Sequence, residues 1–297
     1  MTNYRMRKLV FFVTKIALML GIVALLDMIG ASKAFAWGPG VHTVIALHTL
    51  DMARDLFPGI GSIIASNPLE YLYGSLAADF FLMKSQIRST RHAHHWKGGF
   101  AFLNEARNAT EQAYAYGFLA HLAADVIAHN VFIPNLVAIF PNKRRTGHIY
   151  WEIRADYVVG PLYTKIAKDV LGTDQRACDE ILRSMTHKRK NGLKASKRIY
   201  TQGVRISDYL YDTVPGLFGG KTLRWDGFRD YVVRMVMVSS LFVEEFLRDP
   251  PHSVCLKHDP NGKGKAKPLR RQGLFARLFS SRRPYLPTPR NQEIFRI

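Results

Sequence analysis

The chain has 297 residues, of which 47% are hydrophobic and 22% are charged. These proportions exclude a wholly disordered chain and are sufficient to bury the core of one domain of ordinary size. The net charge of +19 fits an anionic substrate, an anionic membrane surface or simple solubility. Two cysteines, Cys178 and Cys255, exclude a disulfide-rich scaffold and leave a single bridge or two free thiols.

Residues 1–36 have the pattern of an export signal. Basic residues near the start precede an apolar stretch over residues 9–31, and Ala34-Phe35-Ala36 is a small-x-small site for signal peptidase. Cleavage there would make Trp37 the new N-terminus. We therefore expect an exported protein, periplasmic or secreted.

An uncleaved membrane anchor is the alternative, because the apolar stretch is long for a signal. Lys15 and Asp27 interrupt that stretch. A charge at the centre of a membrane span costs ~2.5–3.5 kcal/mol, so these residues argue against a stable anchor.

Apolar residues at helical spacing predict an all-α fold, a single multi-helix bundle over residues 37–249. Thr110 and Glu111 suit the N-cap and first turn of one helix, and residues 133–147, with Pro134 and Pro141, suggest a loop. No strict alternation of β-branched residues suggests a strand. The expected helices cover approximately residues 41–57, 68–82, 101–109, 110–130, 148–171, 175–186, 195–213 and 227–247.

The composition changes at Pro250, and residues 250–297 are rich in Pro, Gly, Lys and Arg. Such a composition predicts a basic, disordered tail. Within it, residues 274–279 combine apolar and basic side chains. This patch could contact an anionic membrane or remain a weakly ordered tail.

The strongest candidate site consists of His121, Asp125 and His129, which are each four positions apart. Residues four apart on an α-helix lie almost above one another, so three ligand-type side chains share one stripe. His148 and Glu152 repeat the spacing. Core histidines paired with carboxylates are the alternative, but five such residues on two helices favour a metal site.

Further candidates lie upstream. His42 belongs to the first helix, and the run His92-Ala93-His94-His95-Trp96 contains three histidines. Asp79 is surrounded by apolar residues, where an unpaired carboxylate is costly to bury. It would also oppose the dipole at the end of its helix. A nearby cation explains it best.

In order and residue type, this pattern resembles the zinc-dependent phospholipase C family. Its relatives include the single-strand-specific zinc nucleases and the phospholipase D that cleaves glycosylphosphatidylinositol anchors. The resemblance covers approximately residues 37–156. The matching positions are Trp37, His42, Asp79, one histidine of residues 92–96, His121, Asp125, His129, His148 and Glu152.

The resemblance implies a site for up to three zinc ions. The first would take Asp79, a histidine of residues 92–95, His121 and Asp125. The second would take His129, His148 and Glu152. The third would take His42, a bridging Asp125, and the amino and carbonyl groups of Trp37, so signal cleavage would complete the site.

The pattern does not decide every ligand. His92, His94 and His95 compete for one position; His94 is slightly favoured, and His95 stays a candidate because it directly precedes Trp96. His187, His252 and His258 show no acidic partner at helical spacing, which favours surface roles.

The implied activity is hydrolysis of a phosphodiester by a zinc-activated water, with Asp79 orienting or deprotonating that water. The expected substrate is a phospholipid headgroup ester. A nuclease acting on single-stranded nucleic acid is the alternative enzyme. The non-enzymatic alternative is a metal-stabilised domain that binds lipid surfaces through its basic tail. No protein partner can be inferred.

Overall fold

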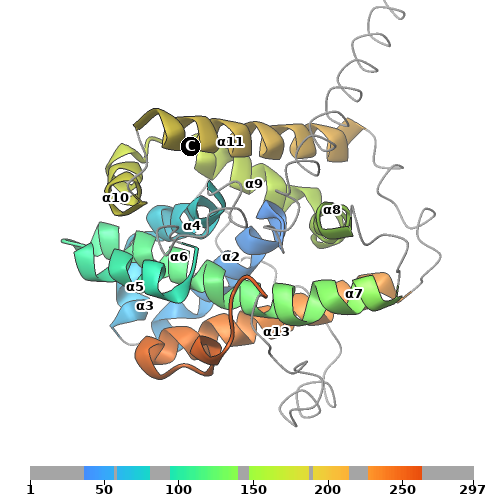
Figure 1. Cartoon of the computed structure of the whole chain (residues 1–297), viewed down its shortest axis with the longest axis horizontal. Coiled ribbons are helices and arrows are strands. Elements are labelled where there is room, and N and C mark those ends of the chain that lie inside the picture. The colour runs from blue at the N-terminus through green and yellow to red at the C-terminus, as the bar shows by residue number, and fades with distance from the viewer. Residues whose placement is uncertain are drawn as a thin grey trace, which may run out of the picture.

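The computed structural model describes residues 37–56, 59–80, 94–139, 147–186, 190–213 and 227–262. Every regular element in these ranges is helical (Figure 1). The predicted all-α fold is therefore confirmed. The expected export signal lies outside the described residues.

The α-helices are α2 (Pro39–Leu56), α3 (Ile60–Ser66), α4 (Pro68–Ala77), α5 (Trp96–Glu105), α6 (Ala109–Ile127), α7 (Ile133–Ile139), α8 (Gly147–Val159), α9 (Pro161–Leu171), α10 (Arg176–Thr186), α11 (Lys190–Thr213) and α13 (Phe228–Arg248). Short 3-10 turns form η2 (Ala78–Phe80), η6 (Pro250–His252) and η7 (Val254–Lys257). A π-helical turn, η3 (Ala128–Phe132), continues α6.

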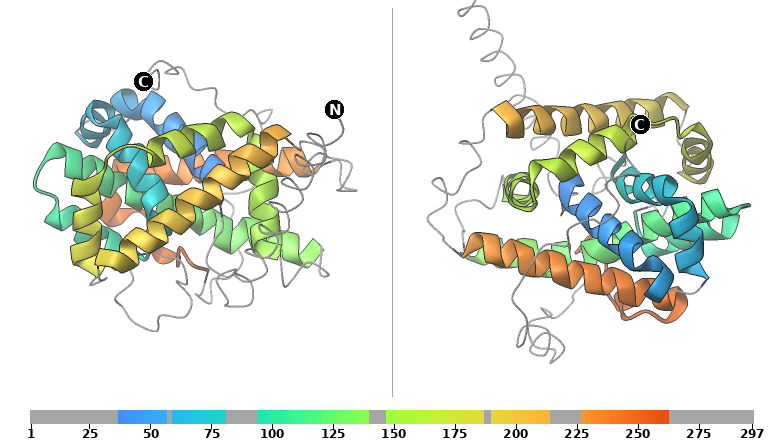
Figure 2. Two further views of the ribbon diagram at one scale, coloured as in Figure 1. Left: turned by 90° about the horizontal axis from the view of Figure 1, so that it is seen from above. Right: turned by 180° about the vertical axis from the view of Figure 1, so that it is seen from behind.

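Helix α2 lies at the centre of the bundle. It packs against α9 on one side and α13 on the other, and α11 covers α9 (Figures 1 and 2). Helix α6 packs against α4, α5 and α13. One continuous apolar core extends through these helices, from Trp37 to Cys255, so the described residues form a single domain.

Two glycines let α4 and α6 approach to backbone contact. A Cβ on Gly74 would lie 2.1 Å from the carbonyl oxygen of Tyr114, and a Cβ on Gly117 would lie 2.0 Å from that of Tyr71. Real Cβ atoms do not tolerate such distances, so only glycine allows this crossing. The contact places the C-terminal end of α4 beside the middle of α6.

Three sequence expectations about helices are wrong. The single helix expected over 148–171 is divided into α8 and α9. Gly160 takes a φ of 119°, and Pro161 begins α9. A left-handed residue followed by a residue without an N–H cannot continue a helix.

The second error is the loop expected over 133–147, of which residues 133–139 form α7. Pro134 comes directly after the π-helical turn η3, where the regular i→i−4 bonding of the helix is already interrupted. The third is the N-cap. Asn108, not Thr110, caps α6: its side chain accepts from the N–H of Glu111 at 2.9 Å. The carboxylate of Glu111 accepts from the N–H of Arg107 at 2.7 Å.

The disordered tail expected from Pro250 is also wrong for residues 250–262. Pro250 and Cys255 are buried, and η7 packs against α13. Apolar burial therefore outweighs the Pro- and Gly-rich composition of this segment. Residues 263–297 lie outside the described residues.

Both cysteines are free thiols buried in the bundle. Burial raises the pKa of Cys178 and of Cys255 to about 12. Of the two sequence alternatives, the structure has the free thiols.

Residues Ala109–Val137 form the one described helical run that is long and apolar enough to cross a membrane. Of its most apolar window, 89% is buried inside the bundle. The core helix of a folded domain has the same properties, so this run needs no membrane to explain it.

Candidate metal centre

Six of the predicted ligand residues meet inside the bundle, on α2, η2, α6 and η3 and just before the start of α5. We call them the His/Asp cluster: His42, Asp79, His94, His121, Asp125 and His129. Each of these six residues is at most 7% exposed. Burial of this many polar groups requires compensation by partners or by a cation.

The stripe expected on α6 is present. Asp125 lies at the centre: its Oδ2 is 3.3 Å from Nε2 of His121 and 3.9 Å from Nε2 of His129. The other carboxylate oxygen of Asp125, Oδ1, is 3.4 Å from Nε2 of His42. The i, i+4 spacing therefore brings its three members together, and α2 adds a fourth.

His121 is held in one orientation by the end of α4. Its Nδ1 lies 2.8 Å from the carbonyl oxygen of Ser75, in the last turn of α4. A carbonyl can only accept, so Nδ1 carries the proton and Nε2 of a neutral ring keeps a lone pair. The close contact at Gly74 and Gly117 makes this bond possible.

His94 is held in the same tautomer from another direction. Its Nδ1 lies 3.1 Å from Oδ1 of Asn261, and Nδ2 of Asn261 donates to the backbone carbonyl of His94 at 2.8 Å. The second bond fixes which end of the amide faces the ring. Nδ1 of His94 is therefore the donor, and its Nε2 keeps a lone pair.

The two Nε2 atoms face each other. Nε2 of His94 is 3.0 Å from Nε2 of His121 and 3.2 Å from Oδ2 of Asp125. An oxygen of Asp79 is 3.7 Å from Nε2 of His121. In these tautomers the Nε2 atoms of His94 and His121 direct lone pairs toward each other and toward the Asp125 carboxylate. This arrangement is repulsive unless a cation, either a proton or a metal ion, lies at its centre.

The ionisation of the central groups suits a metal. Burial by itself would raise the pKa of Asp125, but His121, His42 and His94 hold it well below its ordinary value. Burial and the neighbouring His121 lower the pKa of His42. A carboxylate and a neutral imidazole are the forms that bind a metal.

Further carboxylates act on the same region from α8. Burial raises the pKa of Tyr200 on α11 well above its ordinary value, and Asp79, Asp156, Glu152 and Asp125 raise it further. The four carboxylates are all buried. Their combined field favours cations at this place.

The donor set fits zinc. Two groups of three residues have ligand atoms within 4.8 Å of one another: His42, Asp79 and His121, and His94, His121 and Asp125. Imidazole nitrogen and carboxylate oxygen are zinc ligands, and second bonds from Nδ1 to a carbonyl or amide oxygen are the usual support for such histidines. His42 lies with Asp79 and His121, a grouping that differs from the ligand sets expected from the sequence.

The structure separates the adjacent histidines. His94 is fully buried in the cluster, whereas His95 is the N-cap of α5 and accepts from the N–H of Gly98 at 2.8 Å. His95 thus has a local structural role, and His92 lies outside the described residues. Their sequence positions do not reveal this, because neighbouring side chains before a helix point in different directions.

The remaining predicted ligands are close to the start of α2 and on α8. Trp37 is fully buried, donates from Nε1 to Oγ of Ser239 at 3.1 Å and stacks on Phe132. Glu152 is buried on α8. The backbone of His148 lies in α8, and its side chain is not among the described ones. The metal roles of these three residues stay predictions.

Sequence reasoning missed Asp156. Its carboxylate accepts from the N–H groups of Gly40 and Val41 at 3.0 and 2.9 Å, in the first turn of α2. A Cβ on Gly38 would lie 2.4 Å from this carboxylate, which explains a glycine after Trp37. Burial raises the pKa of Asp156 to about 7 although the two backbone bonds lower it. A carboxylate four residues after Glu152 was the available signal.

We expect Asp156→Asn to destabilise the protein by about 1–3 kcal/mol, because the amide nitrogen would face a buried N–H group. It would also weaken zinc binding, since His42 lies in the same turn. Urea unfolding measures the first effect and chelator competition the second. Asp174→Asn is the control: Asp174 is exposed and pairs with Arg176, and we expect a change within about 0.5 kcal/mol. Equal stabilities of the two variants would contradict the prediction.

Two surface assignments are also resolved. His252 is exposed as expected, but Asp249 lies 2.9 Å from its Nδ1, an acidic partner at i–3 that was overlooked. His258 is held through its backbone: its carbonyl oxygen accepts a hydrogen bond from Nε1 of Trp96 at 2.8 Å. His187 lies outside the described residues.

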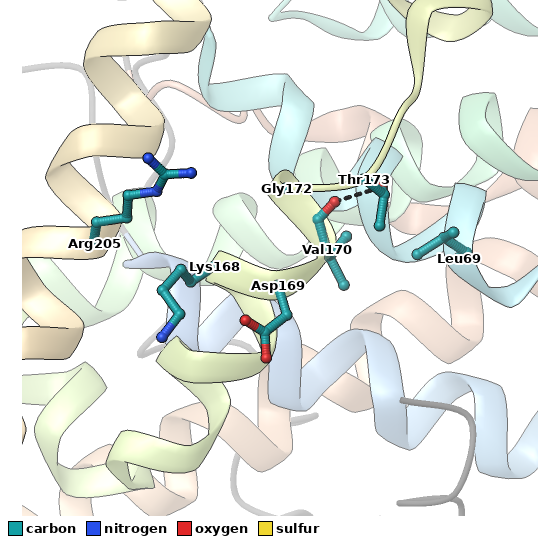
Figure 3. Close-up of a pocket in the computed structure, with 7 residues that line it drawn as sticks. All are labelled: Leu69, Lys168, Asp169, Val170, Gly172, Thr173 and Arg205. Atoms are coloured by element: carbon teal, nitrogen blue, oxygen red, sulfur yellow. Dashed lines mark hydrogen bonds between the residues drawn. The ribbon is translucent and has the colours of Figure 1, made fainter. Parts of the chain in front are cut away.

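A pocket of about 550 Å³ lies elsewhere, between α4, α9 and α11 (Figure 3). Its lining residues are Leu69, Lys168, Asp169, Val170, Gly172, Thr173 and Arg205. No member of the His/Asp cluster is among them. The site is therefore defined by converging ligand atoms and not by this pocket.

The helical fold and the buried His/Asp cluster define the class: an α-helical protein with a zinc-type metal centre. Residues 41–212 match the family model of the zinc dependent phospholipase C. The chain belongs to this family, and the suspected resemblance is confirmed. No curated protein and no solved structure matches the chain. The matched range contains the whole cluster, and Asn261 lies beyond its end.

Proposed function

We propose that the protein is an exported zinc-dependent phosphodiesterase that hydrolyses the headgroup ester of a phospholipid. The observation that carries this proposal is the convergence of the Nε2 atoms of His94 and His121 with the carboxylate of Asp125 at one buried point. Membership of the family supports the phospholipid as the substrate class.

When bound, zinc would lower the pKa of a water toward ~7 and neutralise charge on the phosphate. The residues of the chain hold the ligand side chains in position. Ser75 and Asn261 orient the rings of His121 and His94, and the buried surroundings strengthen every charge interaction at the cluster.

Asp79 is the residue we assign to the attacking water. Its carboxylate is buried and belongs to one of the two compact ligand groups, beside His42 and His121. It would orient the water and accept its proton while the new P–O bond forms and the bond to the glycerol oxygen breaks. The proton would then pass to the leaving alkoxide.

Export is part of this proposal. Cleavage before Trp37 would place a free amine beside the first turn of α2, where Gly40 and Val41 are held by Asp156. A neutral amine is a possible zinc ligand, as the family resemblance implies. In that case export and activation are the same event.

The decisive test is metal content, N-terminal sequence and substrate turnover on one exported sample. We expect up to three zinc ions per chain, Trp37 as first residue, and hydrolysis of short-chain phosphatidylcholine. Faster cleavage of single-stranded DNA than of the phospholipid would show that the enzyme is a nuclease and not a phospholipase. Absence of bound metal in the exported form would overturn both.

Zinc should also stabilise the fold. We expect removal of zinc by a chelator to lower the melting temperature and re-addition to restore it, because an ion at 100 times its Kd contributes about 2.7 kcal/mol. Differential scanning calorimetry measures this shift, and magnesium, which prefers all-oxygen sites, is the control ion. Equal melting temperatures with zinc and with chelator would contradict it.

A further inference from the structure

The segment 258–262, which follows η7, lies against the metal centre. Three hydrogen bonds attach it to helices of the bundle: from Nε1 of Trp96 to the carbonyl of His258 at 2.8 Å, from Nδ2 of Asn130 to the carbonyl of Asp259 at 3.0 Å, and from Nδ2 of Asn261 to the carbonyl of His94 at 2.8 Å. We call these residues the C-terminal strap. They are beyond the family match, which ends at residue 212.

The strap reaches two of the cluster's histidines. Gly262 has a φ of 66°, and a Cβ there would lie 2.9 Å from the carbonyl oxygen of His129. Only glycine combines this left-handed backbone with so close an approach. The side chain of Asn261 faces the ring of His94 at the same time.

Asn261 is itself held in place. Oδ1 of Asp259 accepts from the backbone N–H of Asn261 at 2.8 Å and from its Nδ2 at 3.2 Å. Nδ2 also donates to the His94 carbonyl. The amide nitrogen therefore has two acceptors, and Oδ1 is left facing Nδ1 of His94. The amide cannot turn over without breaking both bonds.

We propose that the C-terminal strap is a working part of the metal centre, in which Asn261 is a positioning residue that keeps His94 in its Nδ1-protonated tautomer. Nε2 of His94 is then the nitrogen that faces Asp125 and His121 and is available to a cation. Without Asn261, Nε2 could take the proton and donate to Asp125, which would close the site to metal. The proposal rests on the proposed zinc function.

The first test reads the tautomer in the metal-free, full-length mature protein. In ¹⁵N-histidine NMR, with the His94 signal assigned from a His94→Gln variant, we expect wild-type His94 to be protonated at Nδ1. Asn261→Leu, similar in size but without either bond, should shift the proton toward Nε2. A wild-type His94 that carries no proton at Nδ1 would overturn the proposal without any variant.

The second test measures zinc affinity by chelator competition. Losing a partner of this kind typically weakens metal binding by about 10–100-fold, and we expect this loss in Asn261→Leu. Asn261→Asp keeps an acceptor for Nδ1 but loses the two bonds that Nδ2 donates, so it should recover only part of the affinity. The visible spectrum of bound cobalt(II) should change in Asn261→Leu and return in part in Asn261→Asp.

The matched control is Asn135→Leu. Asn135 is also a partly buried amide, but it donates to the hydroxyl of Tyr231 at 3.3 Å, and we expect no change in tautomer or affinity. Equal zinc affinity and equal spectra in wild type and Asn261→Leu would overturn the proposal. If the wild type binds no zinc, the proposed function fails, while the metal-free NMR measurement still decides the role of Asn261.

Discussion

Asp125→Asn is expected to remove zinc binding and to lower phosphodiester turnover on the order of 10³-fold or more, since electrostatic stabilisation by the bound metal would be lost. Asp125 lies within 3.2–3.4 Å of His94, His121 and His42. An amide at this position carries no charge and presents an N–H₂ group to the ligand nitrogens.

The same substitution should leave the metal-free fold intact. The new amide can donate to the Nε2 lone pairs, so we expect the melting temperature without zinc to equal or exceed that of the wild type. The shift on adding zinc should vanish. Calorimetry with and without zinc, beside turnover of short-chain phosphatidylcholine, separates these effects.

His95→Asn is the control for this experiment. His95 caps α5 through the N–H of Gly98, and asparagine is a good N-cap residue. We expect zinc binding and turnover close to wild type. Loss of zinc in His95→Asn with retention in Asp125→Asn would contradict the described centre.

Gly117→Ala is expected to give the largest loss of stability. The added Cβ would lie 2.0 Å from the carbonyl oxygen of Tyr71 and 3.0 Å from the backbone nitrogen of Ser75. Both are backbone atoms of α4, so no side-chain rotation relieves the clash and the helices must separate. Overpacking typically costs 1–3 kcal/mol, and for contacts with backbone we expect about 3 kcal/mol or more. Urea unfolding measures the difference.

Separation of α4 from α6 should also weaken zinc binding, because it removes the bond from His121 to the carbonyl of Ser75. The control is Gly203→Ala on α11, where an added Cβ meets nothing within 4 Å. Alanine is the better helix former by about 0.8–1.0 kcal/mol, so this variant should be more stable than wild type. Equal unfolding midpoints for the two variants would refute the close-contact explanation.

Local periodicity in the sequence was sufficient to predict the helical class and several residues of the His/Asp cluster. The i, i+4 spacing of His121, Asp125 and His129 is a property of one helix and requires no knowledge of its neighbours. The all-α class follows from apolar spacing in the same way. The isolated carboxylate Asp79 needed only the cost of burying an unpaired charge. Each of these inferences depends on interactions within one segment.

Other features depend on contacts between distant segments. His94 and His95 are adjacent in the chain, and their sequence positions do not distinguish them. Packing directs the side chain of His94 into the cluster and that of His95 to the first turn of α5. Asp156 acts on a helix more than 100 positions away, at Gly40. Asn261 lay in a segment whose composition predicted disorder, because composition does not show what a segment packs against.

The sequence by itself thus determined the all-α class and the residues that meet in the His/Asp cluster, since these follow from spacing and from the cost of burying charge. Only the tertiary structure decided which nitrogen of each histidine carries its proton. That choice depends on the carbonyl of Ser75 and the amide of Asn261, groups that reach His121 and His94 only after α4 and the C-terminal strap have packed against them.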